Sequence, residues 1–368
     1  MAYAEELRAK GQRIADALER VGHVKLDLPP VMGAEDPFRY RNKVQFPVSQ
    51  GKQGPLVGYY RPRSHDVLDA PDCPLQPESV ARLRGAFKGW MEKYSIQPYH
   101  EGTGRGLVRH LYVRTNSRGE SLVCVVANSP RLPHSGELVE ILRQTELGLA
   151  GVVLNVNTRD TNVILGDRYS VLWGRDWLEE ELCHLAFRLS VPSFFQINRA
   201  QTERLYGVAL DFAQLNGEET VLDLYCGIGT ISLALARQAG YVIGAEIVPQ
   251  AIEDAKENAR RNGIVNGRFF CGDAGETAQK LRAEGIHPQV VCVDPPRKGL
   301  APEVPAILAG MAPERIVYVS CDPATLARDV ARLGEMGYYV VKAQGVDLFP
   351  RTAHVETVVQ LSHKNPIA

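Results

Sequence analysis

The stretch Val221-Leu-Asp-Leu-Tyr-Cys-Gly-Ile-Gly-Thr-Ile-Ser232 decides how the second half of this chain folds. Its apolar run breaks at Gly227 and Gly229, and an alanine- and leucine-rich segment over residues 231–238 follows. This order is typical of a strand, a glycine turn and the first turns of a helix. Because glycine has no side chain, the two glycines let the backbone pass close to a bound ligand.

Glu246 points to the kind of ligand. It ends the next predicted strand, about 20 residues after the first glycine, where an acidic side chain can accept hydrogen bonds from ribose hydroxyls. Ser232 replaces the third glycine of the dinucleotide-binding pattern, and no lysine that could grip a phosphate follows. The pattern therefore favours a nucleoside without phosphates, such as S-adenosylmethionine, over an ordinary strand-to-helix turn.

Length and composition limit the remaining possibilities. A chain of 368 residues is long enough for about two domains. Lys+Arg 42 against Asp+Glu 43 leaves a formal net charge of -1, so nucleic-acid binding would need local basic patches. The N-terminal segment has no apolar signal core, and no apolar run reaches the length of a membrane span, so we expect a cytoplasmic protein without membrane contact. Seven cysteines without a Cys-x-x-Cys pair indicate a reducing compartment and no self-contained zinc site.

The hydrophobic pattern divides the chain into residues 1–188 and 189–368. An amphipathic helix over residues 4–20 precedes short alternating segments, which predict an antiparallel α+β domain. From residue 191 on, strands and helices alternate, which predicts an α/β, Rossmann-like domain with a mostly parallel, doubly wound sheet. The tail from Ser362 is expected to fray. We expect strands at 44–48, 111–114, 122–127 and 151–156 in the first domain, and at 221–225, 241–246, 268–271, 289–294, 315–321 and 355–361 in the second.

The first domain carries three basic clusters interleaved with tyrosines. Alternation along a strand places polar residues outside in any case, so a plain solvated face is one interpretation. RNA binding through phosphates and stacked bases is the equal alternative. The basic residues concerned are Arg39, Arg41, Lys43, Arg61, Arg63, Arg105, Arg109 and Arg114.

Polar residues recur at the carboxyl ends of the predicted parallel strands, where ligands bind in a doubly wound sheet. They are the turn at Tyr225, then Glu246, Asp273, Asp294 and Cys321. Asp294 opens Asp-Pro-Pro-Arg-Lys-Gly, whose two prolines stiffen the turn; the alternative is a rigid loop with a helix-capping aspartate.

Cys321 and Glu356 are the candidates for chemistry. Cys321 follows a predicted strand and precedes Asp322 and Pro323, which suit the cap and first residue of a helix. The positive end of that helix is expected to lower the pKa of the thiol, although a free cysteine is more often a small buried apolar residue. Glu356 lies in an apolar strand, so it must pair, face solvent or take part in catalysis, and the sequence leaves these open.

Together these motifs resemble the S-adenosylmethionine-dependent RNA 5-methyluridine methyltransferases, which act on ribosomal and transfer RNA. The resemblance extends from near residue 3 to near residue 361. Its most specific segments are Phe194-Phe-Gln-Ile-Asn198, Asp223-Leu-Tyr-Cys-Gly-Ile-Gly229, Asp294-Pro-Pro-Arg-Lys-Gly299, Ser320-Cys-Asp-Pro323 and His354-Val-Glu356.

The resemblance implies a class I methyltransferase domain preceded by an RNA-binding domain. Cys321 would add to C6 of the target uracil, which makes C5 nucleophilic, and Glu356 would later remove the C5 proton as general base. The target base must be flipped out of the RNA stack. The residues that would bind the cofactor or the target base are Gln196, Tyr225, Gly227, Gly229, Thr230, Glu246, Asp273 and Asp294.

One departure concerns an iron–sulfur cluster. Many ribosomal-RNA members hold such a cluster with four cysteines and carry an N-terminal oligonucleotide-binding domain. Here Asp72-Cys73-Pro74 resembles the fourth ligand, and the other three would precede Met1. Cys73 alone cannot hold a cluster, so we expect none in this chain, which is either shortened or works without it. Cys73 still favours 23S ribosomal RNA as substrate, since the transfer-RNA branch lacks this cysteine.

Other functions compete with this interpretation. A transfer-RNA uracil-5-methyltransferase is the first alternative, and a catalytically silent RNA-binding protein that retains the nucleoside pocket is the second. A cytosine-5 RNA methyltransferase would carry a second cysteine beside the proline of the motif at Asp294, where Arg297 follows the two prolines. An adenine-N6 methyltransferase would place an aromatic residue there. We expect the protein to be a monomer.

Overall fold

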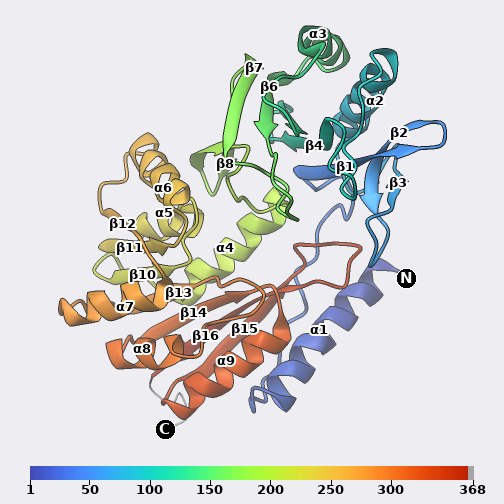
Figure 1. Ribbon diagram of the computed structural model, residues 1–368. Coiled ribbons are helices and arrows are strands. Elements are labelled where there is room, and N and C mark those ends of the chain that lie inside the picture. Colours follow the sequence, from blue (N-terminus) through green and yellow to red (C-terminus); the bar gives the residue numbers. More distant parts are fainter. Residues whose placement is uncertain (364–368) are drawn as a thin grey trace. The chain divides into compact units, whose positions relative to one another are not determined.

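The computed structural model describes residues 1–363 and divides into two compact units (Figure 1). The first, here called the α+β unit, comprises Phe38–Glu180 and Arg188–Ser193. The second, the Rossmann-like unit, comprises Met1–Pro37, Glu181–Phe187 and the chain from Phe194 on. No helix within residues 1–363 combines the length and the apolar character needed to cross a bilayer. The expectation for the tail falls mostly outside the described residues.

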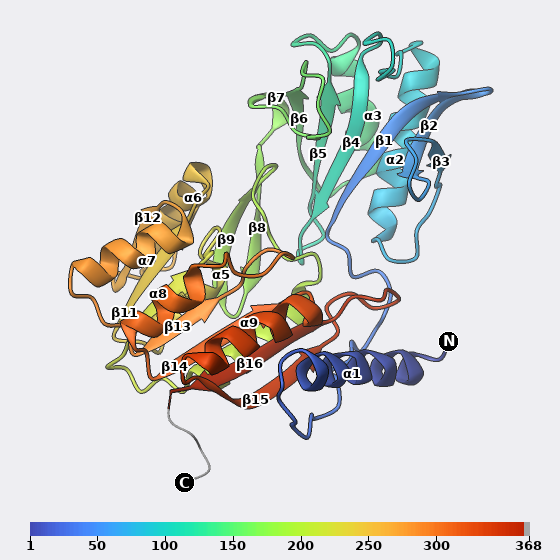
Figure 2. The same ribbon diagram turned by 60° about the horizontal axis from the view of Figure 1, so that its bottom comes forward.

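A seven-stranded sheet forms the α+β unit, in the order β3-β2-β1-β4-β5-β6-β7. The helices α2 and α3 lie beside the strands of this sheet (Figure 2). Phe87 of α2 and Leu138 of α3 are buried in one core with side chains of the strands. The predicted antiparallel arrangement departs from the structure at one place, because β5 and β6 run parallel with α3 as the crossover between them. The elements are β1 (Lys43–Gly51), β2 (Gly54–Tyr60), β3 (Val67–Asp69), α2 (Glu78–Lys93), β4 (Val108–Thr115), β5 (Ser121–Ala127), α3 (Ser135–Thr145), β6 (Leu149–Val156) and β7 (Arg168–Gly174).

A second seven-stranded sheet forms the Rossmann-like unit, in the order β12-β11-β10-β13-β14-β16-β15. The α/β prediction is confirmed: five strands are parallel, and β16 is antiparallel to both β14 and β15. The strand β15 was not predicted from the sequence. The elements are α1 (Tyr3–Arg20), α4 (Arg199–Ala213), β10 (Thr220–Leu224), α5 (Thr230–Ala236), β11 (Tyr241–Glu246), α6 (Pro249–Arg261), β12 (Gly267–Cys271), α7 (Ala274–Ala283), β13 (Val290–Val293), α8 (Val304–Met311), β14 (Arg315–Ser320), α9 (Pro323–Glu335), β15 (Tyr339–Val346) and β16 (Glu356–Ser362).

The strand order predicts where a ligand would bind to this second sheet. It reverses between β10 and β13, and a doubly wound sheet opens a crevice at the carboxyl ends of its strands at such a point. The hairpin of β8 (Trp177–Leu182) and β9 (Leu185–Ser190) includes residues of both units.

The N-terminal helix α1 lies in a different unit from the one predicted. Its predicted place is with residues 1–188, whereas Ile14 and Leu18 are buried in the core of the Rossmann-like unit. The side chain of Lys10 is also buried, and its Nζ lies 2.7 Å from Asp347 Oδ1 and 2.7 Å from Glu6 Oε1. An apolar stripe predicts that a helix is covered, but not which neighbour covers it.

Candidate active site

The turn after β10 has the open backbone that its glycines predict. Gly227 and Gly229 have φ values of 55° and 86°, in the left-handed region that favours glycine. A Cβ on Gly229 would lie 3.3 Å from the Cβ of Ala255, so a glycine permits the close approach of α6. A Cβ on Gly227 would meet nothing within 4 Å, so there is open space beside this part of the turn.

Glu246 closes the other side of this turn. Its Oε2 accepts a hydrogen bond from the N–H of Gly227 at 3.2 Å, and its Oε1 accepts one from the N–H of Val248 at 3.0 Å. Each carboxylate oxygen has a second acceptor site. The structure thus brings Glu246 to the glycine turn with acceptor capacity left for ribose hydroxyls.

Three further predicted residues lie near the starts of helices. Asp273 caps α7, since its Oδ1 accepts hydrogen bonds from the N–H groups of Gly275 and Glu276 at 2.8 and 3.3 Å. Thr230 begins α5, and its Oγ1 lies 2.7 Å from the hydroxyl of Tyr206. Gln196 is half-buried just before α4, whose predicted cap Asn198 accepts from the N–H of Gln201.

Asp294 and Glu356 form the acidic centre of the site. Asp294 follows β13, and burial raises the pKa of its carboxyl to about 7. Glu356 begins β16, and because this strand is antiparallel to β14, its first residue lies at the rim where the parallel strands end. The side chain of Glu356 is only 2% exposed. Burial, together with the charge of Asp294, raises its pKa well above the usual value.

Cys321 lies beside Glu356. Ser320 pairs with Thr357 at the end of β14, and Cys321 and Glu356 are the residues next to this pair. Asp322 caps α9 as predicted, with its Oδ1 2.9 Å from the N–H of Ala324. The predicted lowering of the thiol pKa is wrong for the protein alone: burial, then the charges of Glu356 and Asp294, raise the pKa of Cys321 to about 11. Desolvation and two carboxylates outweigh the favourable end of one helix.

Asp223 is a further candidate site residue, which was not predicted from the sequence. It is 1% exposed within β10, and Ser232 Oγ donates a hydrogen bond to its Oδ2. Its Oδ1 has no hydrogen-bond partner among the described residues, and burial raises the pKa of its carboxyl to about 7. A single acid inside the apolar segment 220–224 was the signal that could have identified it.

Arg297 lies in the motif Asp294–Gly299, and the sequence predicted no role for it. Its positive charge opposes the rise in pKa of both Cys321 and Glu356. Its Nη2 lies 3.2 Å from Nε2 of His354, and burial followed by the charge of Arg297 lowers the pKa of that histidine. Arg297 is therefore a cation whose charge acts on both Cys321 and Glu356.

These residues fit a positively charged nucleoside. A buried carboxylate oxygen without a partner, such as Asp223 Oδ1, is stabilised when a cationic group approaches it. S-adenosylmethionine carries both an ammonium and a sulfonium charge on a nucleoside. Glu246 offers acceptors for its ribose, and the space beside Gly227 leaves room for it.

Three basic residues predicted to contact RNA bond to groups of the α+β unit, and two of them, Arg109 and Arg114, are buried there. Arg39 lies 2.8 and 3.0 Å from the two carboxylate oxygens of Asp72. Arg109 is 6% exposed and donates to the carbonyl oxygens of residues 157, 159 and 161. Arg114 is 1% exposed and donates to the carbonyl of Ser193. These contacts support a role in folding for the buried Arg109 and Arg114, whereas RNA contact by the partly exposed Arg39 stays a prediction.

The remaining basic residues differ in accessibility. Arg61, Arg63 and Arg105 are exposed, whereas Arg41 and Lys43 are half-buried. Burial, with the nearby charges of Arg114 and Arg41, lowers the pKa of Lys43 to about 8. Cys73 is half-buried, and within residues 1–363 no group of three or more His, Cys, Asp or Glu side chains could hold a metal ion.

The chain is similar in sequence to known RNA methyltransferases. The profile of the tRNA (Uracil-5-)-methyltransferase family matches residues 152–364. An uncharacterized RNA methyltransferase of Clostridium tetani is 44% identical over 99% of this chain and 79% of its own length. Another, from Halalkalibacterium halodurans, is 42% identical over 99% of this chain and 80% of its own.

A solved structure shares the fold over nearly the whole chain. It is the Pyrococcus abyssi tRNA (uracil-54, C5)-methyltransferase in complex with S-adenosyl-L-homocysteine. The TM-score is 0.80 at 26% sequence identity, and the match covers 98% of this chain and 84% of that one.

Proposed function

Since this chain belongs to the family of S-adenosylmethionine-dependent uracil-5 RNA methyltransferases, we propose that it methylates C5 of a uridine in 23S ribosomal RNA through a covalent adduct on Cys321. The observation that carries the proposal is the pairing of β14 with β16, which sets a half-buried thiol beside the buried carboxyl of Glu356 at the rim of the sheet. A monomer acting in the cytoplasm is part of the same proposal.

Methylation of uracil C5 needs a nucleophile first and a base afterwards. Uracil C5 is a poor nucleophile, so Sγ of Cys321 first forms a bond to C6 and leaves an electron pair on C5. S-adenosylmethionine, when bound, supplies an electrophilic methyl group to that carbon. Glu356 then takes the C5 proton, the electron pair of that C–H bond restores the C5–C6 double bond, and the bond from C6 to Sγ breaks.

The charges around Cys321 and Glu356 suit these roles. A carboxyl with a raised pKa is a stronger base once it is ionised, which suits proton removal from carbon by Glu356. The positive charge of Arg297 opposes the rise in pKa of both groups, so it favours the thiolate of Cys321 and the carboxylate of Glu356. Arg297 therefore stabilises the two reactive forms that the mechanism requires.

The choice of ribosomal RNA depends on Cys73, which resembles a ligand position of the ribosomal-RNA branch. The transfer-RNA alternative is kept because the solved relative from Pyrococcus abyssi is described as a tRNA methyltransferase. Both alternatives use the same residues of the Rossmann-like unit. They differ only in the RNA that presents the uracil.

A direct assay separates the alternatives. The purified protein is incubated with methyl-labelled S-adenosylmethionine and either 23S ribosomal RNA or transfer RNA from cells that lack the protein, and digested nucleosides are analysed for 5-methyluridine. We expect labelled 5-methyluridine from the ribosomal RNA. Label in transfer RNA alone would establish the alternative substrate. Binding of S-adenosylmethionine without label in either RNA would indicate a silent RNA-binding protein.

A further inference from the structure

A cavity of about 440 Å³ lies within the α+β unit. None of the residues assigned above to the cofactor or to catalysis lines it. Its walls come from β1 and β2, from residues 65–67, from the loop 98–102 and from the beginning of β4. This volume falls in the range of small-molecule sites in proteins, roughly 300 to 1,000 Å³.

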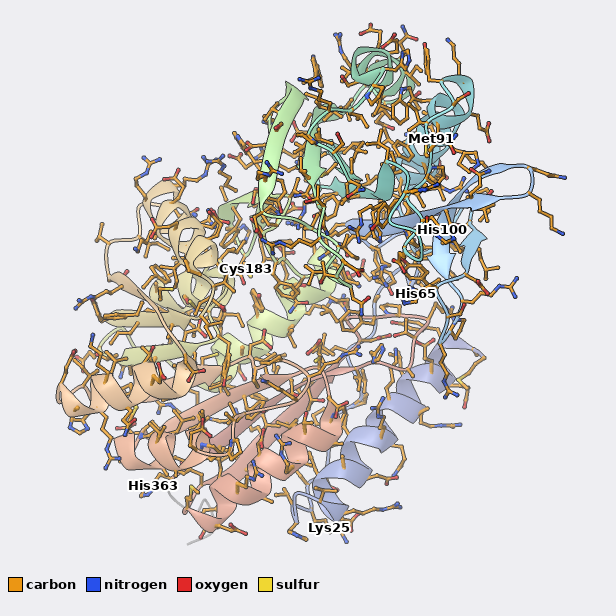
Figure 3. The ribbon with its side chains drawn as sticks, viewed as in Figure 1. Lys25, His65, Met91, His100, Cys183 and His363 are labelled. Atoms are coloured by element: carbon orange, nitrogen blue, oxygen red, sulfur yellow. The ribbon has the colours of Figure 1, made fainter. Side chains whose placement is uncertain are left out.

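Aromatic rings line much of this cavity. Tyr60 is 39% exposed, and its ring centroid lies 5.2 Å from that of His65. The guanidinium of Arg109 lies 4.3 Å from the ring centroid of Tyr99. Figure 3 labels two of the lining residues, His65 and His100, in this part of the unit. The exposed ring of Tyr60 offers a face on which a planar ligand can stack.

One buried polar atom in the lining lacks a partner. The ring of His110 is 6% exposed, and its Nδ1 has no hydrogen-bond partner within the described part of the chain. A buried polar nitrogen in this state costs free energy that a hydrogen-bonding ligand would recover. His110 is thus the second feature, after the aromatic faces, that points to a ligand.

The charges in the lining do not favour a phosphate. Glu101 and Asp66 both line the cavity, and Glu101 Oε2 lies 2.5 Å from His65 Nδ1. The guanidinium of Arg109 is engaged with backbone carbonyls. Burial and the charge of Arg109 lower the pKa of His110 to about 4, so its ring is neutral at neutral pH. A neutral planar ligand fits these surroundings better than an anion.

We propose that this cavity binds an unstacked base of the substrate RNA, other than the target uracil, that carries an exocyclic amino group, as adenine and cytosine do. Proteins read single-stranded RNA by stacking splayed bases on aromatic rings and bonding their edges. Carboxylates such as those of Glu101 and Asp66 accept from amino groups, which uracil lacks. The inference rests on the proposed function, since it takes RNA to be the substrate.

The test measures binding of the full-length protein to fluorescent oligonucleotides of adenine, cytosine or uracil, each about ten nucleotides long, by anisotropy at fixed salt. The adenine and cytosine oligonucleotides should bind more tightly than the uracil one. Tyr60→Ala should weaken their binding about tenfold, because a stacking face is lost. Glu101→Gln should reduce the preference for adenine over uracil, since an amide can also donate to uracil oxygens.

Tyr169→Ala is the matched control. Tyr169 is 36% exposed in β7 of the same unit and does not line the cavity, so its loss should not change binding. Equal effects of Tyr60→Ala and Tyr169→Ala, or equal affinity of the wild-type protein for all three oligonucleotides, would overturn the inference.

Methyl transfer to ribosomal and transfer RNA is assayed on the same preparations. If the protein methylates RNA but binds the three oligonucleotides equally, the inference about the cavity is wrong and the proposed function stands. A preference that depends on Tyr60, without transfer to either RNA, supports base binding and contradicts the proposed function.

Discussion

Buried charges occur in both units of this protein, but their partners differ. In the Rossmann-like unit, Asp223 and Glu356 are buried and Asp294 is partly buried, and all three carboxyls have raised pKa values. In the α+β unit, Arg109 and Arg114 are also buried, but they donate to backbone carbonyls of their own unit. In the first arrangement the ionised carboxylates are destabilised by burial, and a cationic or hydrogen-bonding substrate can stabilise them. Such shifted pKa values are typical of a functional site. The second arrangement stabilises the fold.

Removing the proposed nucleophile should have the largest effect. Cys321→Ala should abolish both 5-methyluridine and any covalent RNA adduct, because no other group would activate C6. Glu356→Gln should slow turnover by about 10² to 10⁴ and let a methylated RNA adduct accumulate, because elimination waits for proton removal. Denaturing gels and mass spectrometry of the adduct measure both outcomes.

The control for this experiment is Cys271→Ala, which changes an exposed cysteine and should leave activity unaltered. RNA with 5-fluorouracil at the target should trap the unmodified enzyme, since C5 then has no proton to lose. An adduct mapped to Cys226 or Cys292 would show that another thiol is the nucleophile.

Asp223→Asn tests whether the buried carboxyls carry a cost for the fold. The folded-state pKa of about 7 lies above the usual unfolded value, so wild-type stability falls as pH rises from about 4 to 7. The variant has no carboxyl at this position, so its stability does not fall for this reason. It should match the wild type near pH 4 and exceed it at pH 8 by up to about 4 kcal/mol.

Urea denaturation at the two pH values checks this expectation. The amide can still accept from Ser232, so the hydrogen bond to Oδ2 is retained. Binding of S-adenosylmethionine should weaken in the same variant. Equal stability of the two proteins at pH 8 would contradict the account of a strained carboxylate.

Arg109→Met tests the opposite role of buried charge in the α+β unit. The variant leaves the carbonyls of residues 157, 159 and 161 without their donor and should lower the free energy of unfolding by about 2 to 4 kcal/mol. Arg105→Met, at an exposed position of the same sequence cluster, should change it by less than about 0.5 kcal/mol. Similar thermal unfolding of the two variants would remove the distinction between them.

Glu246→Ala should weaken binding of S-adenosylmethionine by about 1 to 3 kcal/mol, since ribose hydroxyls lose their acceptor. Isothermal titration calorimetry measures this change. Glu253→Ala, on the exposed face of α6, is the control and should bind normally. Unchanged affinity of the Glu246 variant would rule out this residue as the ribose acceptor.

The smallest effect is expected for the exposed arginines. Arg61→Ala and Arg63→Ala should each reduce the slope of RNA affinity against salt by roughly 0.7 to 0.9 if each contacts one phosphate, while turnover of bound RNA stays nearly constant. Arg143→Ala, an exposed change on α3 that removes the same charge, should leave the slope unchanged. Equal slopes in all variants would show that Arg61 and Arg63 do not contact phosphates.

Much of the Rossmann-like unit was predictable because its signals are local. The strand, glycine turn and helix at residues 221–238 follow from apolar runs and two glycines, and the caps Asn198 and Asp322 follow from their positions before helices. The strand β15 escaped notice because its residues Lys342 and Gln344 interrupt an apolar run. The parallel pairing of β5 with β6 depends on which strands become neighbours in the sheet, and the residues of a single strand do not indicate its neighbours.

The sequence by itself determined the α/β class, the rim of polar residues at the strand ends and the resemblance to a family, since each depends on residue order and spacing. The tertiary structure alone decided that α1 packs in the Rossmann-like unit, that Arg109 and Arg114 hold loops and strands together, and that the thiol pKa of Cys321 rises to about 11. These properties depend on burial and on charges brought close by folding, such as Glu356 beside Cys321 from a strand 35 positions later in the chain. Desolvation and Coulomb interactions act through space, so the order of residues along the chain does not reveal them.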